Sequence, residues 1–482
     1  MASVLDRLER VLEPEAPAWG IDPVPPEHRR LSGLDMAVLW GSLSLGFLVL
    51  VTGTLLVPAL GLRGALLAIL VGSAVGCAPL ALVAVAGARE GVPGMVLFRP
   101  LLGLRGSYLP TALNVLQLVG WTAVEFWAMG QMANRMSVRL FGLDAYPLWL
   151  VLAALVCTAL ALGGPVLVVR RWLERFGIYV VLAAGAWITV GALRRADLGA
   201  LWSRPGEGGL PLGLAVDLVI AMPISWLPLV ADYSRFSRPR ARVFAGTYWG
   251  YLLGNVWFYA LGALLVLSAG AEPSVAGIAV AVASLTAGPL VLVALLVVET
   301  DEAFADVYSA AVSAQNVAPA ADQRRLVLAV AAVGLGLAWF LTMEAYEVFL
   351  FLIGSVFVPL FGVFAAHYFV LHRGRYGPAS PTGAAGRPGG WVDGLPALRP
   401  LALLPWAAGF LLYHWSVPTG PAWWQGAVRT VFHGWLGLPF PLAGSALGAS
   451  APAFLAAFAL GLLVLGPASR GRSAARAGAP PR

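Results

Sequence analysis

The stretch DLVIAMPISWLPLVADYSRFSRPRAR, residues 217–242, decides the fold of this 482-residue chain. It is apolar enough to cross a bilayer, yet Pro223 and Pro228 lie inside it. Each proline removes a backbone N–H and clashes with the preceding turn, so an unbroken helix is not expected. In a membrane, protein or a water-filled cavity must satisfy the freed carbonyls. Secondary transporters build binding sites from such broken spans; the alternative is a simple proline kink.

Composition places the whole chain in a membrane. Its residues are 59% hydrophobic and 11% charged, whereas a soluble domain has about 25% charged residues. The net charge of +7 comes entirely from arginine. These arginines lie in short loops between apolar spans, which indicates membrane orientation and no nucleic-acid partner. Cys77 and Cys157 lie in apolar segments, so neither a disulfide nor a metal site is expected.

Apolar segments predict about twelve membrane spans. Most of the 31 arginines fall in segments that lie on one side when both termini are inside. This bias predicts a multi-pass protein of the cell (inner) membrane with both termini cytoplasmic. The predicted spans are 34–60, 64–88, 108–134, 146–166, 174–193, 211–233, 243–269, 287–317, 325–343, 346–371, 400–416 and 440–467.

The first ten spans divide into two sets of five, which must insert with opposite topology because five is odd. The run Gly41–Gly46 interrupts the first span, and the proline pair interrupts the sixth. Interrupted spans at matching positions of two halves indicate an inverted-repeat transporter site. The predicted organisation is a cytoplasmic N-terminal segment (1–33), two repeats (34–193 and 211–371), a cytoplasmic loop (372–399), two further helices (400–467) and a disordered tail (468–482).

Trp121 and Glu125 lie four residues apart in the third span, so they share one helical face. A carboxylate at this depth is costly and should face a cavity or a partner. A planar ligand could stack on Trp121 while Glu125 accepts hydrogen bonds from its N–H groups. Alternatively, Glu125 pairs with another helix and Trp121 only packs.

The eighth span concentrates four carboxylates, Glu299, Asp301, Glu302 and Asp306, without a nearby basic residue. This pattern indicates a cation or proton pathway rather than lipid contact. Ser309 shares a face with Asp306, and oxygen ligands suit a hard cation such as sodium. Alternatively, such serines bond to their own helix backbone.

His367 in the tenth span is a candidate proton relay, although a hydrogen-bonded core histidine fits equally well. The chain shows no nucleotide-binding loop, paired-cysteine motif, HExxH motif or GxSxG motif. We therefore expect no enzyme activity and no cofactor other than a coupling ion.

Five segments in series resemble the nucleobase:cation symporter-1 family, which includes cytosine permeases and hydantoin transporters. They are WGSLSLGFLVLVTGTLL, GWTAVEFWA, ADYSRFSR, FADVYSAAVSAQN and GSVFVPLFGVFAAHYFV. Details such as FADVYSAAVS and PISWLPL are most similar to the branch proposed to carry hydroxymethylpyrimidine, a thiamine precursor.

The resemblance implies an all-α fold of two inverted five-helix repeats, of the leucine-transporter type, with two extra C-terminal helices. It also implies that Trp121 stacks on the substrate and that Glu125, where many relatives have an amide, suits an aminopyrimidine. The family's aromatic wall in the sixth span aligns near a proline here, so Trp226, with Ser225 beside it, would take that role. Asn316 is a weaker substrate candidate.

The resemblance further implies alternating access driven by sodium or protons, in a protein expected to be monomeric. His367 replaces an acidic residue of the family pattern in the tenth span. A tyrosine also stands where a smaller hydroxyl is often found in the cation site. The cation-binding residues carried over from the family are Gly41, Ser44, Ala305, Tyr308 and Ser309.

Together these features predict a symporter that imports a small planar pyrimidine, namely hydroxymethylpyrimidine or a related thiamine precursor. Cytosine or another nucleobase is the close alternative. An amino-acid or osmolyte carrier of the same fold is a rival, but a zwitterion's carboxylate would avoid Glu125. A membrane receptor that does not transport is the rival from another class.

Overall fold

The computed structural model describes residues 19–163, 176–238, 242–376, 395–442 and 444–477. These residues form an all-α bundle, with a single isolated β-bridge between Leu31 and Ser237. The main helices are α2 (Gly33–Leu43), α3 (Phe47–Thr54), α4 (Leu62–Glu90), α7 (Tyr108–Phe141), α8 (Tyr146–Gly163), α10 (Ile178–Arg195), α12 (Leu212–Ser225), α13 (Val230–Ser234), α14 (Val243–Ala269), α16 (Gly288–Gln315), α17 (Gln323–Ala338), α18 (Met343–Ala365), α19 (Pro400–Ser416) and α21 (Ser450–Ala477). The short ones are η1 (Pro26–His28), α5 (Gly94–Leu97), α6 (Arg99–Leu102), α11 (Leu198–Ser203), α15 (Val275–Ala283), η3 (Ala366–Leu371), α20 (Ala422–Arg429) and η4 (Thr430–Trp435).

Each predicted span overlaps at least one of these helices, which confirms the all-α membrane fold. Within the described residues, five helices are long and apolar enough to cross a membrane, and the bent pair α2–α3 makes a sixth. The five include neither α7 nor α16, although both are longer than a bilayer requires. These two helices carry the polar residues of the candidate site.

The first and sixth spans are both interrupted, as predicted, but only the first is sharply bent, and α12 and α13 together count as one of the five spans. Helices α2 and α3 meet at 51° across a break that runs from Ser44 to Gly46. In the sixth span, α12 ends at Ser225 and α13 begins at Val230, with Pro228 in the gap. Pro223 is accommodated inside α12. The two breaks leave backbone groups near the middle of the bundle that regular helices would have used internally.

Both halves of the broken first span pack closely on α14. A Cβ added at Gly246 or Gly250 would meet the backbone of α2, and one added at Gly254 would meet the Ser44 side chain. One added at Gly262 would meet the Leu50 carbonyl of α3. Small residues along one face let two helix backbones approach in a membrane, where packing drives association. The glycine stripe of α14 therefore fixes the position of the break.

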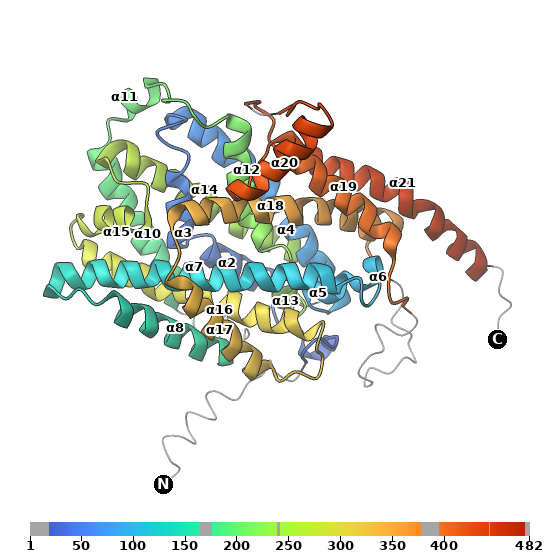
Figure 1. The fold of residues 1–482 in the computed structure, drawn as a ribbon. Helices are drawn as coiled ribbons and strands as arrows, with labels where there is room; N and C mark the ends of the chain where they lie inside the picture. The colour runs from blue at the N-terminus through green and yellow to red at the C-terminus, as the bar shows by residue number, and fades with distance from the viewer. Residues whose placement is uncertain (1–18, 164–175, 239–241, 377–394, 443, 478–482) are drawn as a thin grey trace, which may run out of the picture.

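Helices of one half of the chain pack on helices of the other half. Helix α2 packs on α14 and α10, and its counterpart α12 packs on α4 and α18. The third helices of the two halves, α7 and α16, lie side by side. In Figure 1, α7 extends across the bundle, with α5 and α6 near one end and α10 and α15 toward the other. This arrangement fits two repeats of opposite topology, because loops predicted on the same side of the membrane lie at the same end of the bundle.

The last helix begins later than predicted, at Ser450 rather than near residue 440, and continues to Ala477 into the segment predicted to be disordered. Asp217 of α12 accepts hydrogen bonds from the backbone N–H groups of Ala449 (2.6 Å) and Ser450 (3.1 Å). A carboxylate is favoured at the positive N-terminal end of a helix. Helix α12, which ends at the interruption of the sixth span, thus also anchors α21.

We expect Asp217→Ala to lower the free energy of unfolding by about 1–3 kcal/mol, because two buried N–H groups lose their acceptor. The measurement is thermal unfolding of the detergent-purified protein. Asp197→Ala is the matched control, since Asp197 accepts from Ala200 N–H at the exposed helix α11. Equal losses in the two variants would contradict an anchoring role for Asp217.

Candidate substrate and coupling site

Trp121 and Glu125 project from α7 into the protein interior, where they are 5% and 1% exposed. The Trp121 ring lies edge-on to Tyr346 and Phe349 of α18, with centroid distances of 5.9 and 5.4 Å. The indole N–H of Trp121 and one carboxylate oxygen of Glu125 have no hydrogen-bond partner. The face thus combines aromatic surfaces with an unused donor and an unused acceptor, which is the chemistry that a planar heterocycle requires.

Gln117, one turn before Trp121, joins this face to the break of the sixth span. Its Nε2 donates to the carbonyl of Ser225 at 2.8 Å. The Ser225 hydroxyl itself donates to Met222 O at 2.6 Å, so it bonds to its own helix. The ring of Trp226 packs edge-on against Trp40 of α2, 6.0 Å between centroids. Gln117 was not among the residues predicted for the site, although an amide four residues before Trp121, on the same helical face, is a signal that could have identified it.

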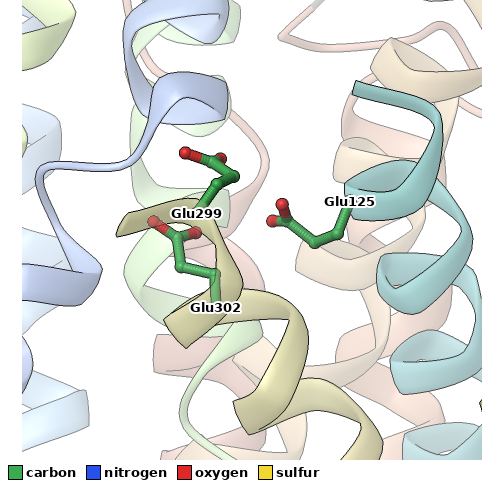
Figure 2. Close-up of side chains that lie close together, drawn as sticks. All are labelled: Glu125, Glu299 and Glu302. Carbon is green, nitrogen blue, oxygen red and sulfur yellow. The ribbon is translucent and has the colours of Figure 1, made fainter. Parts of the chain in front are cut away.

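Glu125 also meets two carboxylates of α16, Glu299 and Glu302. One oxygen of each side chain lies within 4.8 Å of the others, and all three residues are buried. Figure 2 shows Glu125 reaching from α7 toward the two α16 side chains. We call these three residues the carboxylate trio. The sequence predicted a polar pathway on α16, but not that Glu125 would join it.

The trio borders the break of the first span. Glu299 accepts hydrogen bonds from Phe47 N–H at 2.7 Å and Leu48 N–H at 3.3 Å, the first N–H groups of α3. A Cβ added at Gly46 would overlap the Glu302 carboxylate. Glu299 therefore caps the N-terminus of the short helix α3. Because Gly46 has no side chain, the Glu302 carboxylate can occupy the space beside it. The interrupted span and the carboxylates form one structural unit.

Two of the predicted cation ligands lie at this break but are used locally. The Ser44 hydroxyl donates to Gly41 O at 2.8 Å and also lies 3.4 Å from Gly250 O on α14. The serine thus closes the end of α2 and faces α14. The role of Ser44 as a cation ligand, which the family resemblance implies, remains a proposal. A bound cation would compete with these bonds for the hydroxyl oxygen.

The other predicted cation ligands lie on α16 beside an arginine. Ala305 O accepts from Tyr233 OH at 3.3 Å, and Tyr308 OH accepts from Arg235 Nη2 at 3.4 Å. Arg235 is fully buried, as is Ser309. A guanidinium next to Tyr308 repels a further cation. Asp306, the predicted coupling residue of this helix, is buried one turn after Glu302.

Asn316 lies outside this group of residues. Its Oδ1 accepts from Arg99 Nε at 2.6 Å, and its Nδ2 donates to Ser107 and Thr111. The amide is therefore committed to the start of α7 and to α6, with neither end left for a substrate. We leave Asn316 out of the proposed substrate site.

His367 lies in a second group, near the end of the tenth span. Its Nδ1 is 3.1 Å from Tyr376 OH, and its ring is 4.3 Å from that of His372. Burial and nearby Arg399 lower the pKa of His372. Glu90, the last residue of α4, accepts from Tyr368 OH in the same region. His367 thus contacts residues that follow η3, and not the carboxylate trio.

Comparison with known proteins agrees with this geometry. The profile of the family described as permeases for cytosine/purines, uracil, thiamine and allantoin matches residues 23–425. The chain belongs to this permease family. Its members are transporters, not enzymes.

Among curated relatives, the chain is 23% identical to the hydantoin permease of Microbacterium maritypicum over 72% of this chain and 75% of that protein. It is 27% identical to YxlA of Bacillus subtilis, whose name as a purine-cytosine permease is provisional. That match covers 52% of this chain and spans about half (54%) of the relative's length.

Solved structures show the fold. Mhp1, a nucleobase-cation-symport-1 family transporter in a closed conformation with bromovinylhydantoin bound, matches with a TM-score of 0.74. The match covers 94% of this chain and 96% of that one at 19% identity. A Na⁺-coupled sialic acid symporter matches with a TM-score of 0.62 at 12% identity, over 95% of this chain and 94% of that one.

Proposed function

We propose that this permease is a cation-coupled symporter that imports a small planar aminopyrimidine, namely hydroxymethylpyrimidine or a related thiamine precursor. The observation that carries the proposal is the face of α7, where Trp121 and Glu125 lie four residues apart and buried. An aminopyrimidine presents a flat ring and, when the ring nitrogen beside its amino group is protonated, two adjacent N–H donors, which fit a tryptophan face and a carboxylate.

The position of the substrate relative to the interrupted sixth span follows from one hydrogen bond. Gln117 ties this face to the Ser225 carbonyl, so a ligand on Trp121 would lie beside the interrupted sixth span. We propose Trp226 and Ser225 as the far side of the pocket. Cytosine, which also pairs a ring nitrogen with an amino group, is the alternative substrate. The protein would act as a monomer in the inner membrane, with both termini cytoplasmic.

The proposed coupling ion is sodium or a proton, bound by residues of the first and eighth spans. The predicted sodium ligands are Gly41, Ser44, Ala305, Tyr308 and Ser309. The bond from Arg235 to Tyr308 and the local bonds of Ser44 disfavour sodium at these two residues.

We expect Trp121→Ala to weaken hydroxymethylpyrimidine binding roughly 5- to 150-fold, because base–aromatic stacking contributes about 1–3 kcal/mol. Isothermal titration of the purified protein measures the change. Trp249→Ala is the control, since Trp249 lies exposed on α14. Equal affinity in the Trp121 variant and the unmodified protein would remove Trp121 from the site.

A further inference from the structure

The carboxylate trio needs a neutralising charge. One carboxylate oxygen from each of Glu125, Glu299 and Glu302 lies within 4.8 Å of the others, and each residue is at most 3% exposed. Among the described residues, no arginine or histidine makes an ion pair with any of the three. Like charges at this spacing, away from water, strongly disfavour full ionisation. The trio is therefore stable only when it holds protons or a cation.

The three members differ in what surrounds them. Glu299 accepts two backbone N–H groups at the N-terminus of α3, an arrangement that favours a negative charge. Glu302 has an oxygen without any donor, although it is buried against Gly46. Glu125 also has an oxygen without a partner and points at the α16 pair from another helix. Glu299 is thus the fixed anion, and Glu302 is the member that its surroundings favour as a neutral acid.

Within the part of the chain that the structure describes, no neighbouring helix supplies a positive charge to the trio. The titratable groups that interact with it are all acids, so each is neutral or negative. They are Asp301 and Asp306 on α16, Cys157 on α8, Tyr251 on α14 and Tyr346 on α18. A proton is the cation that carboxylates can bind without further ligands, and three of the predicted sodium ligands, Ser44, Ala305 and Tyr308, have other partners.

We propose that the carboxylate trio is the proton-binding site that couples transport, with Glu302 as the residue that gains and loses the proton. This proposal rests on the proposed symporter function. A hydronium ion on the outer side gives its proton to a carboxylate lone pair of Glu302, forming an O–H bond and leaving water. On the inner side this bond breaks and water takes the proton, so no electrons are exchanged. Glu299 caps the N-terminus of α3, and Gly46 lies against Glu302. Protonation of the trio therefore acts directly on the broken first span.

The first arm of the test needs no substrate. Infrared difference spectra of the purified full-length protein, recorded between acidic and alkaline pH, detect the carbonyl stretch of a buried protonated carboxyl group. We expect this band to titrate in the unmodified protein, to vanish in Glu302→Gln and to persist in Glu302→Asp. Glu344→Gln, at an exposed position at the start of α18, is the control and should leave the band unchanged. A band unaffected by Glu302→Gln would overturn the proposal.

The second arm measures hydroxymethylpyrimidine uptake in proteoliposomes. We expect an inward proton gradient to drive accumulation without sodium, and Glu302→Gln to lose this accumulation while it still exchanges the substrate. Accumulation driven equally by a sodium gradient at constant pH in both proteins would overturn the proton site but leave the symporter function standing. No pyrimidine uptake, together with a band lost in Glu302→Gln, would support the proton site and contradict the proposed substrate.

Discussion

Replacing Glu125 with glutamine is expected to weaken hydroxymethylpyrimidine binding by about 10- to 150-fold. The change removes the negative charge but keeps the shape, and a hydrogen bond to a charged group contributes about 1.5–3 kcal/mol. An ionised carboxylate accepts from both the amino group and a protonated ring nitrogen beside it, whereas glutamine presents one acceptor and one donor. The measurement is titration calorimetry with the purified variant.

Uracil provides the matched ligand control, because it lacks the amino group that the Glu125 carboxylate is proposed to accept from. Any affinity for uracil should therefore change less than the affinity for hydroxymethylpyrimidine. The variant should unfold at no lower a temperature, since it also relieves repulsion within the carboxylate trio. Unchanged affinity for hydroxymethylpyrimidine would eliminate Glu125 from the substrate site.

Replacing Gly250 with leucine is expected to abolish the folded protein. A Cβ at this position would lie 2.6 Å from the Ala37 carbonyl oxygen and 3.0 Å from its Cα, so the backbones of α2 and α14 would have to separate. The adjacent contacts of Gly246 and Gly254 leave no freedom for a shift. Overpacking of this kind costs about 1–3 kcal/mol even where a core can adjust, and here the obstacle is backbone.

Gly336→Leu is the control for this prediction, because a Cβ at Gly336 of α17 meets nothing within 4 Å. Size-exclusion chromatography of detergent-solubilised protein distinguishes the two variants. We expect a monodisperse peak for Gly336→Leu and aggregated or absent protein for Gly250→Leu. A monodisperse Gly250→Leu protein with unchanged thermal unfolding would contradict the role of the glycine stripe.

The sequence predicted the features that depend on local chemistry. The prolines Pro223 and Pro228 and the run Gly41–Gly46 correctly predicted the two interrupted spans, because proline and glycine act on their own backbone. Helical periodicity placed Trp121 and Glu125 on one buried face. Apolar length predicted the membrane helices, with the clearest error at the start of α21, where turn-rich sequence precedes Ser450.

The remaining contacts of the site depend on which helix faces pack together. The sequence of a single helix does not reveal its packing partner. Glu125 and the α16 carboxylates are far apart in the chain, and only the packing of α7 on α16 brings them together. Similarly, Asn316 is a polar residue at the end of a relevant helix, but Arg99 and the start of α7 occupy its side chain. The partners of Ala305 and Tyr308 come from the sixth span, so the sequence of the eighth could not reveal them.

The most direct test of the account is ligand-dependent thermal stabilisation of the purified protein, with hydroxymethylpyrimidine, thiamine, cytosine, uracil, hypoxanthine and hydantoin. A ligand that binds only the folded state raises its apparent stability by about 2.7 kcal/mol at a concentration 100 times Kd. We expect hydroxymethylpyrimidine to give the largest stabilisation. This stabilisation should depend on pH but not on sodium, and it should be lost in Trp121→Ala. Stabilisation by none of the aminopyrimidines, or by hypoxanthine or hydantoin alone, would contradict it.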